Sequence, residues 1–297
     1  MKRKSYPIAG VIVIAIIGFA FFMPQQGEKY SVSPEGIISY ANRPAPAYET
    51  FLLKDSPGAR AERISFTSKG ATIYGLLTVP KSLGKVPAFI VLPGATVKKE
   101  AEQESLGNDL NELGFATFVI DVRGEGETGG ALPSLEQDYG TFSEGGEPVQ
   151  HKSIHDVLRA YDILKGKKEI DAGRIYMAGI SNGGRKAVIA AAIEPSIRGA
   201  LLIATAGYKF PGQDDEKLDI FLRSINPDNY IGLISPRRLL MLHSPGDTVI
   251  PISLAQDTFS RAAEPKKFVE VDASPGFHGY EGTTMKDALV AEIEGWL

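Results

Sequence analysis

The chain has 297 residues and a formal net charge of −4, and its lysines and arginines are scattered rather than gathered in a stripe, which excludes a nucleic-acid-binding surface as the leading interpretation. It contains no cysteine, which excludes thiol nucleophiles, disulfides and cysteine metal sites. A hydrophobic content of 43% is enough to bury the core of one catalytic domain.

The chain begins with a basic and then apolar segment. Three basic residues (2–4) precede an uncharged stretch (5–26) with an apolar core (8–23). Positive residues favour the cytoplasmic side, so we expect residues 1–26 to be a signal anchor or transmembrane segment that places the remaining chain outside the cytoplasm. The apolar run is near the lower limit for a transmembrane helix and longer than many signal-peptide cores, so cleavage and secretion are the alternative.

Residues 27–61 are rich in proline, glycine, serine and polar groups, and the prolines interrupt any long element. This composition predicts a tether that packs partly on a catalytic domain of residues 62–297. Two antiparallel edge strands are expected at 63–67 and 72–79, joined by a turn at Lys69 and Gly70.

From residue 87 onward, strand-like and helix-like runs alternate along the chain. The predicted strands are 87–92, 115–121, 174–178, 198–205, 238–243 and 267–272, and the predicted helices are 98–113, 153–165, 183–193, 252–263 and 284–297. Such alternation predicts an α/β fold, a mainly parallel sheet with helices on both faces. Two insertions, 124–150 and 206–236, would form a small cap beyond the carboxyl ends of the strands. Aromatic residues of the second insertion, such as Tyr208 and Phe210, either line a substrate pocket or seal the insertion onto the core.

Ser181 is the central residue of a Gly-Ile-Ser-Asn-Gly pentapeptide at 179–183. This G-x-S-x-G pattern lies between a strand-like and a helix-like run, a context typical of a sharp turn that projects a serine hydroxyl at the top of a parallel sheet. The first helical N–H groups there favour developing negative charge. The alternative is a glycine-serine loop without chemistry, but the flanking runs favour Ser181 as a nucleophile.

A serine nucleophile in such a turn needs a histidine on a later loop, and among four histidines only His278 fits. His278 lies in a Gly/Pro loop after the predicted strand 267–272, although a lone loop histidine is usually a solvated surface group. We expect His243 to be a structural hydrogen-bonding group and His151 and His155 to be surface residues. No pair of these histidines has the spacing of a metal site.

Asp247 is the predicted acid, because it follows the apolar strand 238–243 and stands between the serine and the histidine in chain order. Such a carboxylate holds the imidazole in the tautomer that accepts the serine proton. Its alternative is an ordinary turn aspartate that bonds its own backbone. Asp121 precedes the serine, and Asp272 is too close to His278 along the chain, so both rank below Asp247.

Two backbone N–H groups are needed to stabilise a tetrahedral oxyanion. Asn182, directly after the nucleophile, supplies one. We expect Ala95 to supply the other, from the Pro-Gly-Ala-Thr turn at 93–96 that follows a predicted strand. The alternative is a plain strand-ending turn in which Thr96 caps the next helix.

Arg123 lies just beyond the predicted strand 115–121, where an arginine could hold a substrate carboxylate. We expect instead that it pairs with a nearby acid such as Asp121 or Glu125 and fixes the loop.

Together these motifs resemble the α/β-hydrolase superfamily, and more closely its dienelactone-hydrolase and prolyl-oligopeptidase-type catalytic domains. The resemblance covers about residues 62–297 and rests on five motifs in the same order, at 92–96, 121–126, 179–184, 243–251 and 276–279. The chain departs from the pattern at Pro93, where the family often has histidine, and at Ser244, where it has glycine. Neither position carries the chemistry, so these departures bear on the subfamily.

The resemblance implies an α/β-hydrolase fold and a serine hydrolase that cleaves small-molecule carboxylic esters through an acyl-enzyme, with no metal or organic cofactor. Together with the expected N-terminal anchor, this predicts a membrane-tethered, extracytoplasmic enzyme. One alternative is a short-peptide hydrolase of the prolyl-oligopeptidase type, although the chain has no room for the propeller domain that such enzymes usually add. The other is a catalytically silent, membrane-tethered binding module, whose sign would be a broken triad. The oligomeric state is not predicted.

Overall fold

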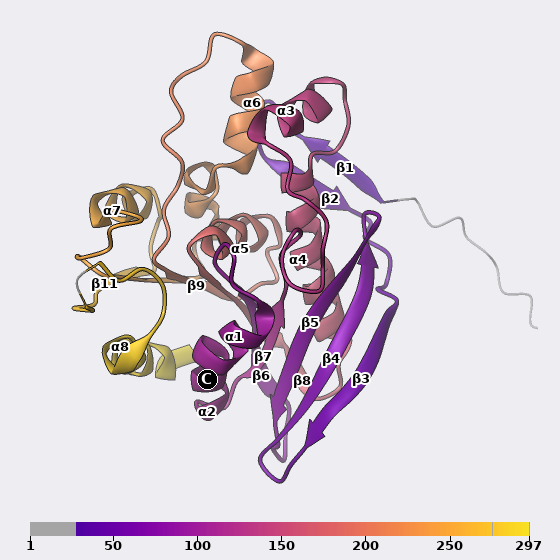
Figure 1. Ribbon diagram of the computed structural model, residues 1–297, viewed down its shortest axis with the longest axis vertical. Helices are drawn as coiled ribbons and strands as arrows, with labels where there is room; N and C mark the ends of the chain where they lie inside the picture. Colours follow the sequence, from indigo (N-terminus) through magenta and orange to yellow (C-terminus); the bar gives the residue numbers. More distant parts are fainter. Residues whose placement is uncertain (1–27, 275, 297) are drawn as a thin grey trace, which may run out of the picture.

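The computed structural model describes residues 28–274 and 276–296, and its centre is a nine-stranded sheet (Figure 1). The strand order is β11-β10-β9-β8-β6-β7-β5-β4-β3. The strands are β3 (Tyr48–Asp55), β4 (Ala59–Ser68), β5 (Ala71–Pro80), β6 (Val86–Leu92), β7 (Ala116–Ile120), β8 (Ile170–Ile180), β9 (Gly199–Ile203), β10 (Arg238–His243) and β11 (Lys266–Glu270). The six strands from β11 to β7 are parallel, and β5, β4 and β3 continue the sheet in antiparallel fashion. The expected mainly parallel sheet is therefore confirmed.

Helices cover both faces of this sheet, as expected. They are α1 (Lys99–Glu102), α2 (Asn108–Glu112), α3 (Leu135–Ser143), α4 (Val149–Gly166), α5 (Asn182–Ile193), α6 (Glu216–Ile225), α7 (Ile252–Ser260) and α8 (Gly282–Ile293), with a π-helical turn at Gln103–Gly107 and 3-10 turns at Pro227–Asn229, Ile231–Ile234 and Glu294–Trp296. The predicted helix 98–113 is thus three pieces, because Ser105 has non-helical dihedral angles (φ −100°, ψ −107°).

Side chains of β6 alternate between two hydrophobic cores because strand residues point to opposite faces of a sheet. Ala88, Ile90 and Leu92 pack into the core that includes α4 and α5. Phe89 and Val91 pack into the opposite core with α2 and α8. All five are fully buried, as the continuous apolar run of this strand requires.

Three strands lie in the segment that we expected to be a tether. β1 (Lys29–Val32) pairs with β2 (Ile38–Ala41) as a separate two-stranded sheet, and β3 forms the edge of the main sheet. All eight residues of β3 are exposed, so no burial pattern in the sequence marked this strand. The division into residues 1–26, 27–61 and 62–297 stays a prediction.

The two insertions form a small cap in which α3 and α6 lie side by side (Figure 1). Phe221, Leu222 and Ile225 of α6 form a hydrophobic cluster with Tyr139 and Phe142 of α3. These side chains pack the two insertions against one another, whereas the structural role considered for the aromatic residues of the second insertion was to seal that insertion onto the core.

The expected signal anchor at 1–26 lies outside the described residues. Within residues 28–274 and 276–296, no helix is long and apolar enough to cross a membrane.

Candidate active site

Ser181 occupies a strained turn between β8 and α5. Its backbone dihedral angles (φ 51°, ψ −117°) lie in a region that side-chain-bearing residues rarely adopt, and such strain is found at functional turns. A Cβ on Gly183 would lie 2.1 Å from the Leu92 carbonyl oxygen, and one on Gly179 would lie 2.6 Å from the Gly183 backbone. The glycines of the pentapeptide are therefore required by the close approach of β6, β8 and α5. The Ser181 N–H donates to the Ile203 carbonyl at 2.9 Å and further fixes the turn.

Asp247 and His278 are in direct contact. The Asp247 Oδ2 lies 2.7 Å from the His278 Nδ1, and the aspartate side chain is completely buried. Its Oδ1 accepts the N–H groups of Val249 at 2.8 Å and Ile250 at 2.9 Å. Backbone donors thus hold one oxygen of the carboxylate in place, while its other oxygen accepts from the imidazole.

The contact with Asp247 favours the His278 tautomer that carries its proton on Nδ1 and leaves the Nε2 lone pair free to accept a proton. That Nε2 is buried and forms no hydrogen bond with any described residue, Ser181 included. Hydrogen bonds between a nucleophile and its base are often long in free enzymes and shorten when substrate binds.

The His278 loop and the Ser181 turn lie beside each other at the carboxyl ends of the parallel strands. A Cβ on Gly279, next to His278, would lie 4.0 Å from the Ile180 side chain, next to Ser181. A Cβ on Gly94 would lie 3.6 Å from that of Ser181, so the loop after β6 also borders this turn. Ligands of open α/β sheets bind at this edge.

The loop after β6 presents Ala95, which is exposed and whose N–H donates to no described residue. The next N–H, of Thr96, donates to the Glu125 carboxylate at 3.0 Å, and Thr96 has a positive φ of 65°. The helix that follows has Lys98 at its N-cap with no side-chain cap, so Thr96 does not cap it. Glu125, in the loop after β7, therefore fixes the loop after β6. The sequence did not predict this contact.

Asp121 anchors the end of the same loop. Its carboxylate accepts the Lys99 backbone N–H at 2.9 Å, the Lys99 Nζ at 2.8 Å and the Glu127 N–H at 2.9 Å. Both side chains of this ion pair are buried, and the pair links the segment after β6, which carries Lys99, to the end of β7, which carries Asp121. We call this ion pair the strut between the two loops. Asp121 is committed to this strut and does not face His278.

Arg123 is structural, as expected, but its expected partners were wrong. It forms a bidentate pair with Asp156 of α4, with Nε–Oδ2 and Nη2–Oδ1 distances of 2.6 and 2.8 Å, and Nη2 also donates to the Ser68 carbonyl at 2.7 Å. The partner lies on a helix 33 residues later, beyond the reach of an inference from neighbouring acids.

The expectation that His151 and His155 are surface residues is wrong, because both are buried in α4. Burial lowers the pKa of His151 to about 3, and its ring bonds Tyr30 Oη at 2.6 Å and Ser224 Oγ at 2.7 Å. Burial lowers the pKa of His155 to about 4, although the Glu28 carboxylate beside it opposes this shift. The His151 ring joins β1 and α6 to α4, and the His155 ring joins Glu28 and the Ser68 hydroxyl of β4 to α4.

His243 has the structural role expected of it. Its Nε2 lies 2.8 Å from the Ile250 carbonyl oxygen and 3.5 Å from the Asp247 carboxylate, at the base of the loop that carries Asp247. Burial lowers its pKa, so the neutral ring donates to the carbonyl and braces that loop.

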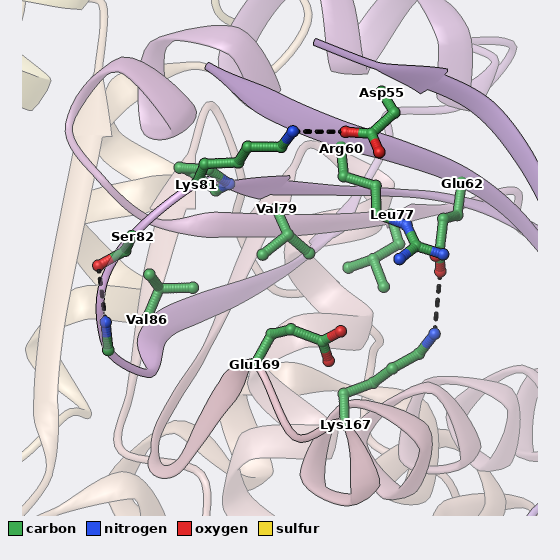
Figure 2. Close-up of a pocket in the computed structure, with 12 residues that line it drawn as sticks. Asp55, Arg60, Glu62, Leu77, Val79, Lys81, Ser82, Val86, Lys167 and Glu169 are labelled. Atoms are coloured by element: carbon green, nitrogen blue, oxygen red, sulfur yellow. Dashed lines mark hydrogen bonds and ion pairs between the residues drawn. The ribbon is translucent and has the colours of Figure 1, made fainter. Parts of the chain in front are cut away.

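A cavity of about 370 Å³ lies at the opposite end of the sheet, at the amino ends of β6 and β8 (Figure 2). Its charged side chains bond one another: Lys81 lies 2.7 Å from Asp55, and Lys167 lies 2.9 Å from Glu62. No histidine lines this cavity, so it lacks the base that a serine nucleophile needs.

Comparison with known proteins gives the family. The family model for acetyl xylan esterase (AXE1) matches residues 53–209, just over half of the chain, which includes Ser181 and Asn182 and ends before Asp247. YfhR of Escherichia coli O157:H7, an uncharacterized protein, is 27% identical over 237 residues, 74% of this chain and 76% of that protein.

Two solved structures share the fold. The acetyl xylan esterase from Paenibacillus sp. R4 has a TM-score of 0.70 at 21% identity and covers 86% of this chain and 90% of its own. Acetyl xylan esterase 1 from Thermoanaerobacterium has a TM-score of 0.67 at 20% identity, with 84% and 88% covered. The chain belongs to the acetyl xylan esterase (AXE1) family, and it is a carboxylesterase-type serine hydrolase with the α/β-hydrolase fold.

Proposed function

We propose that Ser181, His278 and Asp247 are the catalytic triad of this esterase. The observation that carries the proposal is the 2.7 Å contact between Asp247 and His278, whose second ring nitrogen is buried without a partner among the described residues. His278 Nε2 accepts the Ser181 hydroxyl proton as the serine oxygen attacks the ester carbonyl. The imidazolium then gives this proton to the departing alcohol, and Asp247 stabilises the positive charge meanwhile.

The N–H groups of Ala95 and Asn182 form the proposed oxyanion hole. The Thr96 N–H donates to the Glu125 carboxylate, and this contact fixes the loop. The N–H of Ala95, the residue before Thr96, is left to donate to the oxyanion. Asn182 begins α5, where the N–H groups of the first turn, which have no partner within the helix, and the helix dipole favour negative charge.

The acyl-enzyme is then hydrolysed. His278 again acts as the base and accepts a proton from the attacking water, and the serine oxygen leaves as the acid is released.

The substrates proposed are small-molecule esters with short acyl groups, acetyl above all. Support comes from the acetyl xylan esterase family to which the chain belongs and from the two similar structures, which are acetyl xylan esterases. The chemistry of the triad places no demand on the alcohol, so acetylated sugars and simple acetate esters are both candidates.

The test is a series of 4-nitrophenyl esters of increasing acyl length, assayed with the wild type and with Ser181→Ala and Ser196→Ala. Ser196 is an exposed serine beyond the far end of α5 and serves as the matched control. We expect the acetate to have a kcat/KM about tenfold above the octanoate, since an acyl site selective for acetyl groups would disfavour extra methylenes. Ser181→Ala should abolish turnover and Ser196→Ala should not; turnover that survives in Ser181→Ala would overturn the assignment.

We also propose that residues 1–26 anchor the enzyme to a membrane, with the catalytic domain outside the cytoplasm. The support is the basic flank at 2–4 before the uncharged stretch. The full chain should sediment with membranes after an alkaline wash, whereas a variant without residues 2–26 should not. Recovery of an intact full chain in the soluble fraction would contradict an anchor, and a mass that lacks the segment would indicate cleavage and secretion.

A further inference from the structure

Lys186 is a buried lysine without a counter-ion, one helical turn after Asn182 on α5. The residue is only 5% exposed, and its ammonium forms no hydrogen bond or ion pair with a described residue. Burial and, to a smaller extent, the neighbouring positive charge of Arg185 lower its pKa to about 8. A desolvated cation is costly to keep unless an anion or a hydrogen-bond acceptor compensates it.

Lys186 lines a small cavity whose lining residues come from α4, α5, the cap helix α6 and the loop at Tyr208. The cavity also contains Gln150 and Asn182, whose side-chain amides bond no described residue. Arg185 is held at its rim, with Nε 2.8 Å from the Ala206 carbonyl oxygen and the guanidinium 4.1 Å from the centre of the Tyr208 ring. Two side-chain amides and two cations therefore line the same cavity, and one of these residues, Asn182, directly follows Ser181.

The charge in this cavity is positive and unbalanced. Two of its ten lining residues are cationic and none is a carboxylate. Its histidine, His151, is held neutral between Tyr30 and Ser224. Glu125 acts on Lys186 only at longer range, and its carboxylate already accepts the Thr96 N–H.

The size of the cavity limits which anionic group could bind to Lys186. Its room is that of about one water-sized group, too little for a sugar ring or an aromatic ring. A single carboxylate oxygen fits this space, and a lysine binds such an oxygen as a point charge without the paired geometry that arginine demands.

We infer that Lys186, assisted by Gln150 and Asn182, forms a carboxylate subsite next to the nucleophile, so that preferred esters carry an acidic group close to the scissile bond. This inference rests on the proposed function for its position relative to Ser181. It makes Lys186 a determinant of substrate choice that takes no part in proton transfer.

The experiment compares esters with and without a free carboxylate. The acyl side is probed with 4-nitrophenyl butyrate and mono-4-nitrophenyl glutarate, and the alcohol side with methyl 4-acetoxybenzoate and 4-acetoxybenzoate. Each pair is assayed with the wild type, with Lys186→Met and with the control variant Lys168→Met. Lys168 is exposed, and its side chain forms no hydrogen bond or ion pair with a described residue. The readout is the charged-to-neutral ratio of kcat/KM, which a general loss of folding or catalysis does not change.

For the wild type we expect this ratio to exceed one in at least one pair, and Lys186→Met should lower it about tenfold or more, as for the loss of a hydrogen bond to a charged group. Lys168→Met should keep the wild-type ratio. An unchanged ratio in Lys186→Met, or no preference for either acidic ester in the wild type, would overturn the subsite.

A binding measurement separates this result from failure of the proposed function. Glutarate and benzoate should raise the Tm of the wild type and not that of Lys186→Met, whether or not any ester is hydrolysed. Stabilisation of both proteins to the same extent would count against the subsite, and loss of ester turnover alone would count only against the triad.

Discussion

Asp247 binds His278 with one carboxylate oxygen and the backbone of its own loop with the other. The 2.7 Å contact to the imidazole and the two N–H contacts from Val249 and Ile250 use both oxygens in fixed directions. Because β10 and β11 deliver these two loops to the same edge of the sheet, residues 31 apart in the chain meet. The parallel pairing of β10 and β11 thus determines how His278, the proposed base, is oriented.

Replacing Asp247 by Asn should lower kcat by about a thousandfold or more, because an amide that donates to Nδ1 holds the imidazole in the wrong tautomer. The measurement is the kcat for 4-nitrophenyl acetate. Asp272→Asn, an exposed aspartate in the same region, is the control and should keep most of the activity. Equal effects of the two changes would contradict the role of Asp247.

Replacing Glu125 by Ala should release the Thr96 N–H and loosen the loop that carries Ala95. We expect kcat to fall about tenfold while KM changes little, because the oxyanion hole acts in the transition state. The exposed Glu144, changed to Ala, is the comparison. A rise in KM alone would indicate that this loop binds substrate and leaves the oxyanion unaffected.

Replacing Gly183 by Ala should destabilise the fold, because its Cβ would lie 2.1 Å from the Leu92 carbonyl oxygen and 2.4 Å from that of Pro93. The expected loss in free energy of unfolding is about 3 kcal/mol, as for overpacking against fixed backbone. Urea unfolding measures it, with Gly166→Ala as the control, since no atom lies within 4 Å of that Cβ position. A Gly183→Ala protein as stable as the control would refute the packing account of the turn.

Glu102 should make the stability depend on pH. The residue is 5% exposed, and burial raises the pKa of its carboxyl to about 7. The folded chain holds this proton more tightly than the unfolded chain, so the resulting stabilisation is complete below the unfolded pKa of 4.5 and is lost as the pH rises through 7.

Glu102→Gln removes this titration. Its free energy of unfolding, relative to the wild type, should therefore rise by up to about 3 kcal/mol between pH 5 and pH 8. Urea unfolding at the two pH values gives the difference, and the histidines titrate equally in both proteins and cancel. A difference that stays constant with pH would show that Glu102 is charged in the folded state.

The sequence predicted those features whose signals are local. The parallel strands have continuous apolar runs, and the turn at Ser181 has a glycine on each side, which close backbone packing requires. The contact between Asp247 and His278 was expected from chain order and loop position. The catalytic roles of Ser181, Asp247 and His278 stay predictions, as do the oxyanion-hole roles of Ala95 and Asn182.

Features that depend on distant partners were missed. His151 is buried because Tyr30 and Ser224, 121 and 73 residues away, bond its two nitrogens. The strut between Lys99 and Asp121 likewise joins two loops whose proximity is set by the pairing of β6 with β7. Short polar strands such as β1 offer too few residues for a pattern to be read.

The central claim is that Ser181 is the nucleophile activated by His278, and covalent labelling with a fluorophosphonate tests it most directly. The chain without residues 1–26 is treated and digested, and the modified peptide is identified by mass spectrometry. A single adduct on Ser181 that is lost in His278→Ala is the predicted result. An adduct on another serine, or labelling of Ser181 at the same rate in His278→Ala, would contradict the account.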